Sequence, residues 1–414
     1  MDNTKLTKLE KYWILYDVGN SAFILLVATI IPIYFNYLAE NAGISEVNYL
    51  AYWGYASSTA TVIVALIGPV LGTLADMRNL KKPLFTACMM LGVIGCAALS
   101  FPTSWILFLA VFVVARIGYS ASLIFYDSML VDVTTPAKMD IVSSQGYAWG
   151  YIGSCIPFII SLVFVLMNET FGISMHTAMM IAFFLNAAWW LLVTLPLLRK
   201  YRQVNYTELS ERPVKEAFLR LGRTLKEISH QKNIFLYLLA FFFFIDGVYT
   251  IIEMATAYGS ALGLDTQGLL LALLVTQIVA FPFALIFGSL SKKYETGYLI
   301  KICIFAYTCI ALFAIQLDKQ WEFWLLAVLV GMFQGAIQAL SRSYFAKIIP
   351  AEKSGEYFGI YDICGKGASF LGTTLVGAVA QITGHANAGV AVIAVLIMIG
   401  FVLFCKAAKM NHVS

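Results

Sequence analysis

Three ionisable residues stand inside long apolar runs of this 414-residue chain. Arg116 lies in the run 105–131, whereas Asp246 and Glu253 share the run 233–258. A charge near the centre of a membrane helix costs about 2.5–3.5 kcal/mol, so it normally faces other protein or a water-filled cavity. Asp246 and Glu253 are seven residues apart, about two helical turns, and therefore share roughly one helix face.

These three side chains suggest a binding site for a small charged molecule. Arginine is always charged and its planar fork matches a carboxylate, while a carboxylate removed from water can carry a proton. We expect Arg116 to hold an anionic group of a substrate, and Asp246 or Glu253 to bind its cationic group or a coupling proton. The alternatives are a structural ion pair between Arg116 and Asp246, and a Glu253 that lies shallow enough to be simply hydrated.

Four uncharged polar residues in other apolar runs are further candidates for this pathway. They are Asn20, Gln277, Gln334 and Gln338. Asn20 follows Asp17 by three residues, and Gln334 and Gln338 are four apart, so each pair shares a helix face. For each candidate, a hydrogen bond between two helices is the competing interpretation.

A second group of charges lies near the helix ends that the placement of basic residues assigns to the cytoplasm. It comprises Asp17, Asp127, Asp132, Arg342, Asp362 and Lys366, with Asp76 and Arg78 in an adjacent loop. Asp362 and Lys366 are four residues apart and can pair along one helix. Opposite charges on different helices at one membrane face suit a gate that pairs when closed and separates when open. The alternative is an ordinary helix-end charge, which we prefer for Asp132 and Lys347.

The apolar runs that carry these residues indicate an integral membrane protein. Sixty per cent of the residues are hydrophobic and only 12% are charged, against about 25% charged in soluble domains. A membrane helix needs about 20 mostly apolar residues. Twelve runs meet this requirement: 12–38, 50–75, 83–101, 105–131, 142–167, 175–198, 233–258, 267–291, 298–316, 321–348, 356–382 and 388–408.

One long polar stretch, 199–232, separates the first six runs from the last six. It carries nine Lys or Arg residues and four Glu. Apolar residues recur at helical spacing within 213–231, which predicts an amphipathic helix on the membrane surface. A solvated linker is the alternative. The chain thus divides into 1–198, the basic linker 199–232, and 233–414.

Lys and Arg placement predicts the orientation of the twelve helices. With the N-terminus inside, only Lys319 among the 27 Lys and Arg residues lies on an external loop, and Arg116 is mid-membrane. All the others fall in cytoplasmic loops, tails or helix ends. We therefore expect both termini in the cytoplasm.

The two halves look like diverged copies of one unit. After the second run the chain reads GTLADMRNLKKP (72–83), and after the eighth it reads GSLSKKYETG (288–297). Each is a Gly-led helix end followed by a basic turn. Two parallel six-helix halves, related by an axis along the membrane normal, enclose a cavity near the bilayer midplane in major facilitators.

The first of these turns resembles the loop motif between helices 2 and 3 of the major facilitator superfamily. The matching residues are Gly72, Asp76, Arg78 and Lys81 or Lys82, with Asn79 where that motif usually has glycine. Further strings resemble the "unknown major facilitator" family, which includes the autophagy-related vacuolar amino-acid effluxer. They are YDVGNSAF (16–23), FFFFIDGVYTI (241–251), GAIQALSRSYFAKIIP (335–350) and EYFGIYDICGKGASFLG (356–372).

Two departures from that family's pattern stand out. Val18-Gly19 replaces its usual Trp-Ala, and Ser291 stands where the repeat of Asp76 would be acidic. We therefore expect a weaker locking contact at the second loop.

The resemblance implies a secondary transporter that works by alternating access, with the first, fourth, seventh and tenth helices around its cavity. It also implies export of small solutes, with amino acids as the leading class and protons as a candidate coupling ion. A proton-coupled exporter of drugs or metabolites is one alternative. Another is a sensor or scaffold on the same fold that transports nothing.

Other activities find little support in the residues. GIYDICGKG (359–367) lacks the spacing and the Ser or Thr of a phosphate-binding loop. Four histidines and seven cysteines show no metal-ligand spacing, and no catalytic set is recognisable. We expect no enzyme activity, metal, cofactor or nucleic-acid partner, and a monomer in the plasma membrane whose partners are lipid and a small-molecule substrate.

Overall fold

The computed structural model describes residues 5–261 and 266–411, nearly all of them in helices. Twelve segments of this part of the chain are long and apolar enough to cross a membrane. The ends of the twelve predicted runs agree with the observed helical segments to within four residues, which confirms the polytopic all-α fold. Lipid offers no hydrogen bonds to the backbone, so each crossing must satisfy its own amide groups as a helix.

The first half contains six crossings. They are α1 (Lys8–Ala28) continued by α2 (Ile30–Asn41), α3 (Glu46–Ala75), α4 (Lys81–Ala98), α5 (Trp105–Ser128) continued by α6 (Leu130–Val133), α7 (Met139–Leu166) and α8 (Met175–Lys200). The 3-10 turn Pro136–Lys138 precedes α7. The first crossing is interrupted at Thr29, whose hydroxyl donates to the Leu25 carbonyl, and Pro32 follows one turn later. Proline cannot donate the next helical hydrogen bond, which accounts for a break at this place.

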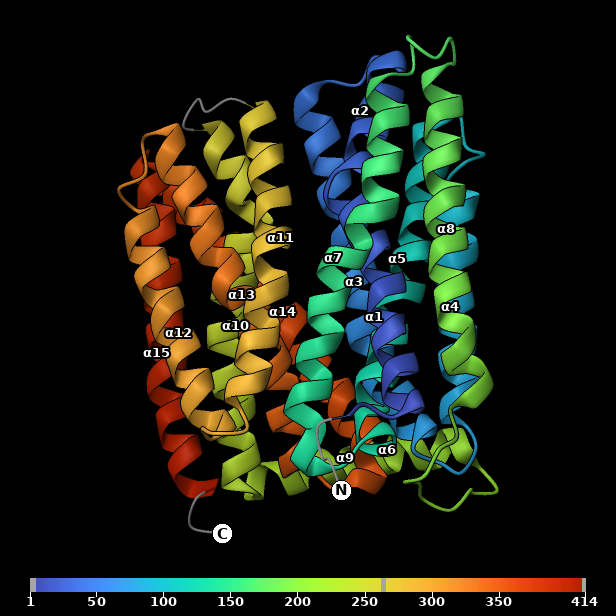
Figure 1. The fold of residues 1–414 in the computed structure, drawn as a ribbon, viewed down its shortest axis with the longest axis vertical. Coiled ribbons are helices and arrows are strands. Elements are labelled where there is room, and N and C mark those ends of the chain that lie inside the picture. Colours follow the sequence, from blue (N-terminus) through green and yellow to red (C-terminus); the bar gives the residue numbers. More distant parts are fainter. Residues whose placement is uncertain (1–4, 262–265, 412–414) are drawn as a thin grey trace.

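The second half contains the remaining six crossings. They are α10 (Lys232–Ala261), α11 (Thr266–Leu290), α12 (Thr296–Ala314), α13 (Gln320–Ile348), α14 (Ser354–Thr383) and α15 (Ala386–Asn411). The 3-10 turn Ala351–Lys353 precedes α14. The halves stand side by side, with α1 beginning and α15 ending at the same end of the molecule (Figure 1). We call this end the terminal face, and it is the end that the sequence assigns to the cytoplasm.

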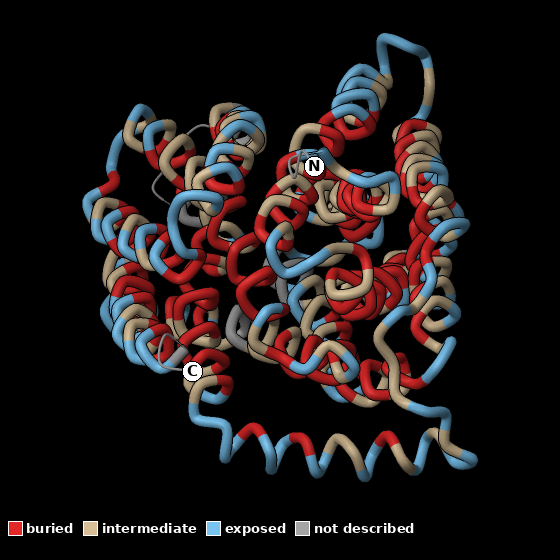
Figure 2. The backbone as a smooth tube through the Cα atoms, turned by 60° about the horizontal axis from the view of Figure 1, so that its bottom comes forward, coloured by how far each residue is buried: buried red, intermediate tan, exposed pale blue. Residues whose placement is uncertain are grey.

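Between the halves lies α9 (Pro213–His230), which confirms the predicted helix at 213–231. It runs along the edge of the terminal face, with buried and exposed residues alternating (Figure 2). The chain before it, from Tyr201 to Thr207, is held on the first half. The Gln203 side-chain amide donates to the Ala75 carbonyl at 2.9 Å, and the Thr207 amide donates to the Asp76 carbonyl at 2.7 Å.

Three helix pairs make most of the contact between the halves: α3 packs against α14, and α7 packs against both α11 and α13. Glycines allow the closest approaches. A side chain at Gly72 of α3 would collide with the Gly355 carbonyl, and one at Gly359 of α14 would come within 2.7 Å of the Pro69 backbone. Small residues of this kind let membrane helices cross with their backbones in contact. The crossing of α3 and α14 therefore depends on these glycines.

Candidate functional site

Arg342 of α13, in the second half, reaches between three helices of the first half. Its Nη1 lies 3.0 Å from Asp127 Oδ1 on α5, and its Nη2 lies 3.3 Å from Asp17 Oδ2 on α1. Its Nε donates to the Ser143 hydroxyl on α7 at 2.9 Å, and Nη2 also donates to the Ser143 carbonyl. Three predicted charges thus meet in one cluster, which we call the Arg342 cluster.

Aromatic rings enclose the Arg342 guanidinium. Its central carbon lies 4.4 Å from the ring centroid of Tyr147, 4.7 Å from that of Trp13 and 5.4 Å from that of Tyr126. The arginine side chain is only 3% exposed. A buried charge is tolerated when it is paired, and removing one partner costs about 3–5 kcal/mol. Sequence reasoning missed the rings of Trp13 and Tyr126, because aromatic residues are common in every crossing.

Asn20 belongs to the surroundings of this cluster. Its side-chain amide donates to Asp17 Oδ1 at 3.5 Å, and the residue is buried. Gly146 of α7 leaves the space that Asp17 and Arg342 occupy, since a side chain there would meet both. Asn20 therefore supports the carboxylate that contacts Arg342.

A second contact between the halves joins the loop after α3 to the start of α14. Asp76 accepts hydrogen bonds from the backbone amides of Gly355 at 2.7 Å and Glu356 at 2.8 Å. The first amides of a helix lack partners within it and carry partial positive charge, so a carboxylate is well placed there. Burial raises the pKa of Asp76 to about 7, although Lys81 and the two amides act in the opposite direction.

Lys81 joins this contact to the linker. Its ammonium donates to the Ser354 hydroxyl at 2.8 Å, and lies 3.7 Å from Asp76 and 3.6 Å from Asp132. Asp132 also accepts from the Tyr201 hydroxyl and from the Asn205 backbone amide. The expectation of Asp132 as an ordinary helix-end charge is therefore wrong, because its side chain is fully buried.

Arg78 is not brought to the interface between the halves. Its side chain lies over the ring of Tyr206 in the linker, 5.3 Å from the centroid, and the residue is exposed. Its backbone amide donates to Thr207. The neighbouring Asn79 has a φ of 65°, a left-handed conformation in which asparagine is the commonest substitute for glycine.

A third contact joins α7 to the second half. Asp140 accepts from the Lys347 ammonium at 2.6 Å, from the Ser343 hydroxyl at 2.6 Å and from the Thr296 hydroxyl at 2.7 Å. Sequence reasoning missed Asp140, and its description of Lys347 as an ordinary helix-end charge is wrong. The available signal was an acidic residue in the first turn of a membrane helix.

Asp362 and Lys366 of α14 pair at 2.6 Å, as their spacing predicts. The Lys366 ammonium also donates to the Ser120 carbonyl of α5 in the other half. Gln338 of α13 reaches the same interface, where it donates to the Tyr151 hydroxyl of α7 at 3.4 Å. These two contacts lie further from the terminal face than the Arg342 cluster.

Arg116 and Asp246 do not form the ion pair that was the structural alternative for them; within the described residues, neither has an oppositely charged side chain within 4.0 Å. Asp246 accepts from the Gly372 amide at 2.9 Å and from the Thr250 hydroxyl at 3.4 Å. Asp246 Oδ2 and Arg116 Nη1 are buried, and no hydrogen-bond partner for them occurs in the described part of the chain. Each has capacity to bind a further group.

The remaining pathway candidates divide between two places. Gln277 and Gln334 line a small cavity of about 40 Å³ between α10, α11 and α13, inside the second half. Glu253 lies two turns beyond Asp246 on α10 and is exposed.

Helix α3 carries exposed apolar side chains. Tyr55 and Leu66 are 66% and 73% exposed. A hollow of about 440 Å³ is lined by Tyr55, Ser58, Thr59, Val62 and Ile63. The described polar contacts between the halves run from Asp76 at the terminal face up to Gln338. Within the described residues, the two halves are thus bonded to each other from the terminal face inward.

Comparisons with known proteins agree with this architecture. The MFS-type transporter YxiO of Bacillus subtilis (strain 168) is 42% identical over 404 residues, which cover 96% of this chain and 94% of that protein. Autophagy-related protein 22 of Cryptococcus neoformans var. neoformans serotype D (strain B-3501A) is 26% identical over 282 residues, covering 62% of this chain and half (50%) of that longer protein.

The fold is also that of a solved transporter. The crystal structure of a Major Facilitator Superfamily transporter, FucP, in the outward conformation, aligns with a TM-score of 0.70 at 12% identity, over 97% of each chain. The family described as "Vacuole effluxer Atg22 like" matches residues 7–138 and 131–411. The chain therefore belongs to the Atg22-like family of major facilitator transporters.

Proposed function

We propose that this protein exports small solutes, with amino acids as the leading class, by alternating access. The observation that carries the proposal is a pair of incompletely bonded charges, Arg116 on α5 and Asp246 on α10. They belong to different halves, and the described polar contacts between the halves gather toward the terminal face. A site shared by two halves that open in turn is the basis of transport in this fold.

An amino acid suits these two charges chemically. Its carboxylate matches the arginine fork, and its ammonium group matches a carboxylate. A buried charge without a full set of partners is costly, so each side chain gains free energy when a ligand group reaches it. A ligand that engages both charges draws the halves toward each other, which links binding to the change of state.

Asp246 is also our candidate for proton coupling. The residue is fully buried, and its described partners are an amide, a hydroxyl and no basic side chain. Protonation would remove the cost of the charge in this place. A coupling proton and the substrate ammonium group would then compete for one carboxylate, which is a simple way to exchange one for the other.

Three contacts would form the gate at the terminal face. They are the Arg342 cluster, the Asp76 contact with the start of α14, and the Asp140 contact with Lys347. All three join opposite halves, so all three must break before the central site opens to that side. We place this side in the cytoplasm and the protein in the plasma membrane, as a monomer.

Uptake into proteoliposomes tests the proposal. A mixture of radiolabelled amino acids is offered to wild type, Arg116→Ala and Asp246→Asn, with and without a pH gradient. The matched controls are Arg199→Ala and Asp318→Asn, which remove exposed charges far from the interface. We expect uptake by the two site variants to fall at least tenfold, and uptake by both controls to stay at the wild-type rate.

The proposal fails in three distinguishable ways. If Arg116→Ala and Asp246→Asn take up amino acids at the wild-type rate, the substrate role assigned to Arg116 and Asp246 is wrong. Absence of uptake of every amino acid, together with a thermal shift caused by another solute class, would replace the substrate. If a pH gradient neither drives nor alters uptake, proton coupling at Asp246 is wrong.

A further inference from the structure

The linker helix α9 carries an exposed apolar stripe from Val214 to Leu225. Val214, Phe218 and Leu225 are 57%, 60% and 51% exposed, and Leu221 lies between them on the same face. Their spacing of four, three and four residues places them on one side of a helix. A stripe of this size is unfavourable in water, so something apolar is expected to cover it.

The order of faces around α9 indicates what that cover is. At about 100° per residue, the stripe lies between two other faces. On one side of it are the buried residues Ala217, Thr224 and Ile228, which face the bundle. On its other side are the exposed basic residues Lys215 and Lys226, and the exposed Arg212 stands just before the first residue of the helix. Around the axis of α9, the face toward the bundle is followed by the apolar stripe and then by the basic face. This order suits a helix that lies at a membrane surface beside the protein.

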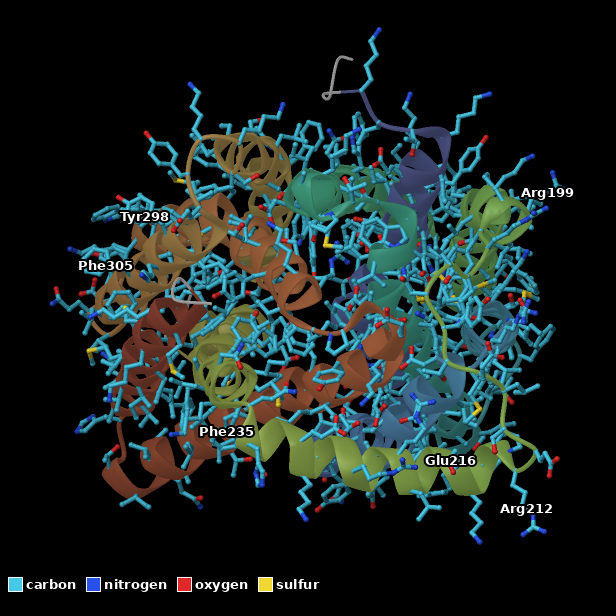
Figure 3. All side chains as sticks on the ribbon, turned by 90° about the horizontal axis from the view of Figure 1, so that it is seen from below. Arg199, Arg212, Glu216, Phe235, Tyr298 and Phe305 are labelled. Carbon is cyan, nitrogen blue, oxygen red and sulfur yellow. The ribbon has the colours of Figure 1, made fainter. Side chains whose placement is uncertain are left out.

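The position of α9 agrees with this arrangement. Seen from below, it runs along the rim of the terminal face and not across its centre, with Arg212 beyond one end and Phe235 near the other (Figure 3). Phe235, at the start of α10, is itself 47% exposed. An exposed apolar side chain of a membrane-crossing helix thus lies next to one end of α9.

Helix α9 is also bonded to the gate contact at Asp76. Arg220 donates to the Thr207 hydroxyl at 2.6 Å and lies 3.7 Å from Glu356 at the start of α14. Thr207 in turn donates to the Asp76 carbonyl. Glu227 accepts from Lys353, just before α14, at 2.9 Å. A force that holds α9 in place therefore also holds the first turn of α14 against Asp76.

We propose that α9 docks on anionic phospholipids of the leaflet at the terminal face, and that this docking stabilises the closed gate. Val214, Phe218 and Leu225 insert beside the acyl chains. Arg212, Lys215 and Lys226 contact the phosphate groups, whereas Arg223 is already paired with Glu216. The placement of this leaflet in the cytoplasm rests on the proposed function, but lipid binding itself does not.

Hydrogen exchange of the full chain in nanodiscs tests the proposal. Discs of phosphatidylcholine are compared with discs of phosphatidylcholine and phosphatidylglycerol. We expect the amides of 213–230 and of 354–358 to exchange more slowly in the anionic discs. In Lys215→Gln/Lys226→Gln this protection falls by about fivefold for each basic residue removed. The control Lys292→Gln/Lys293→Gln removes the same charge from another exposed loop of the terminal face and keeps the protection.

Other outcomes overturn the proposal. Equal exchange of α9 in both kinds of disc would show that lipid charge is not recognised. Protection that rises with the number of protein copies in a disc would assign the stripe to a second copy. Protection of α9 without slower exchange at 354–358 would separate lipid docking from the gate. Since no substrate is needed, a protein that fails to transport amino acids can still pass this test.

Discussion

Asp140 of α7 and Lys347 of α13 form an ion pair across the two halves, with 2.6 Å between Oδ2 and Nζ. In the internal repeat, this contact is equivalent to the Asp76 contact, because each joins the fifth crossing of one half to the other half. The two contacts use different hydrogen-bond donors, however. Asp76 lies in a loop and faces helix amides, whereas Asp140 lies in a helix and accepts from side chains. Ser291, which stands where the repeat of Asp76 would be acidic, donates its hydroxyl to the Gly288 carbonyl at the end of α11.

The first prediction concerns this pair. Asp140→Asn removes a charged hydrogen bond and leaves Lys347 half-paired, which we expect to cost the closed state about 1–2 kcal/mol. Amides 139–146 should then exchange about tenfold faster. The swapped variant Asp140→Lys/Lys347→Asp should recover part of the loss. If the single variant exchanges like wild type, Asp140 does not hold the gate.

The second prediction concerns Arg342. In Arg342→Ala, Asp17 and Asp127 remain buried without their partner, at a cost of about 3–5 kcal/mol. Arg342→Lys keeps the charge but loses the fork that bonds two carboxylates and Ser143, so we expect it to resemble the alanine variant in transport. Arg199→Lys, an exposed change of the same type, is the control.

The measurement for Arg342 is thermal unfolding together with uptake into proteoliposomes. Asp127→Asn should cost less than Arg342→Ala, because Asp17 still pairs with the arginine. Combining Asp127→Asn with Arg342→Ala should restore part of the melting temperature by removing one uncompensated carboxylate. A lysine variant with wild-type uptake would show that only the charge of Arg342 matters.

The third prediction is a pH dependence that arises from Asp76. Burial raises its pKa to about 7 in the closed state, and we expect the ordinary value of about 3.9 when the loop is hydrated in the open state. The closed state therefore binds more protons between these two values. Its stabilisation is complete below about pH 4 and is lost as the pH rises to about 7.

Exchange of amides 354–358, corrected for the intrinsic effect of pH, measures this dependence. Exchange should accelerate from acidic to neutral pH in wild type and change little above it. Asp76→Asn should abolish the dependence, whereas Asp132→Asn, which alters a neighbouring carboxylate on the same lysine, should retain it. Closure that strengthens with rising pH would mean that the ionised Asp76 is the form that holds α14.

Much of the fold was predictable because lipid dictates it, and far less of the site was. The lengths of the apolar runs and the placement of basic residues predicted twelve helices and the depth of each residue in the membrane. That depth alone grouped Asp17, Asp127 and Arg342. Depth does not say which way a side chain faces, however. Arg116 and Asp246 were therefore natural candidates for an ion pair, yet Arg116 lies over the ring of Tyr119 and Asp246 accepts from the Gly372 amide. Asp140 and Asp132 were missed or misjudged because a carboxylate near a helix end can equally well face water.

The last prediction concerns the crossing of α3 and α14. Gly72→Ala places a methyl group against the Gly355 carbonyl, so the helices must separate near the Asp76 contact. Overpacking of this kind costs about 1–3 kcal/mol, and the cost falls on the closed state. Amides 354–358 should exchange faster, and Asp76 should lose its two amide partners. Gly54→Ala is a control on the same helix, since no atom lies within 4 Å of a methyl group there. That variant should be as stable as wild type or slightly more so, because alanine favours the helix by about 0.5–1 kcal/mol. Equal exchange in both variants would mean that the crossing has room to relax and that Gly72 does not set the distance between the halves.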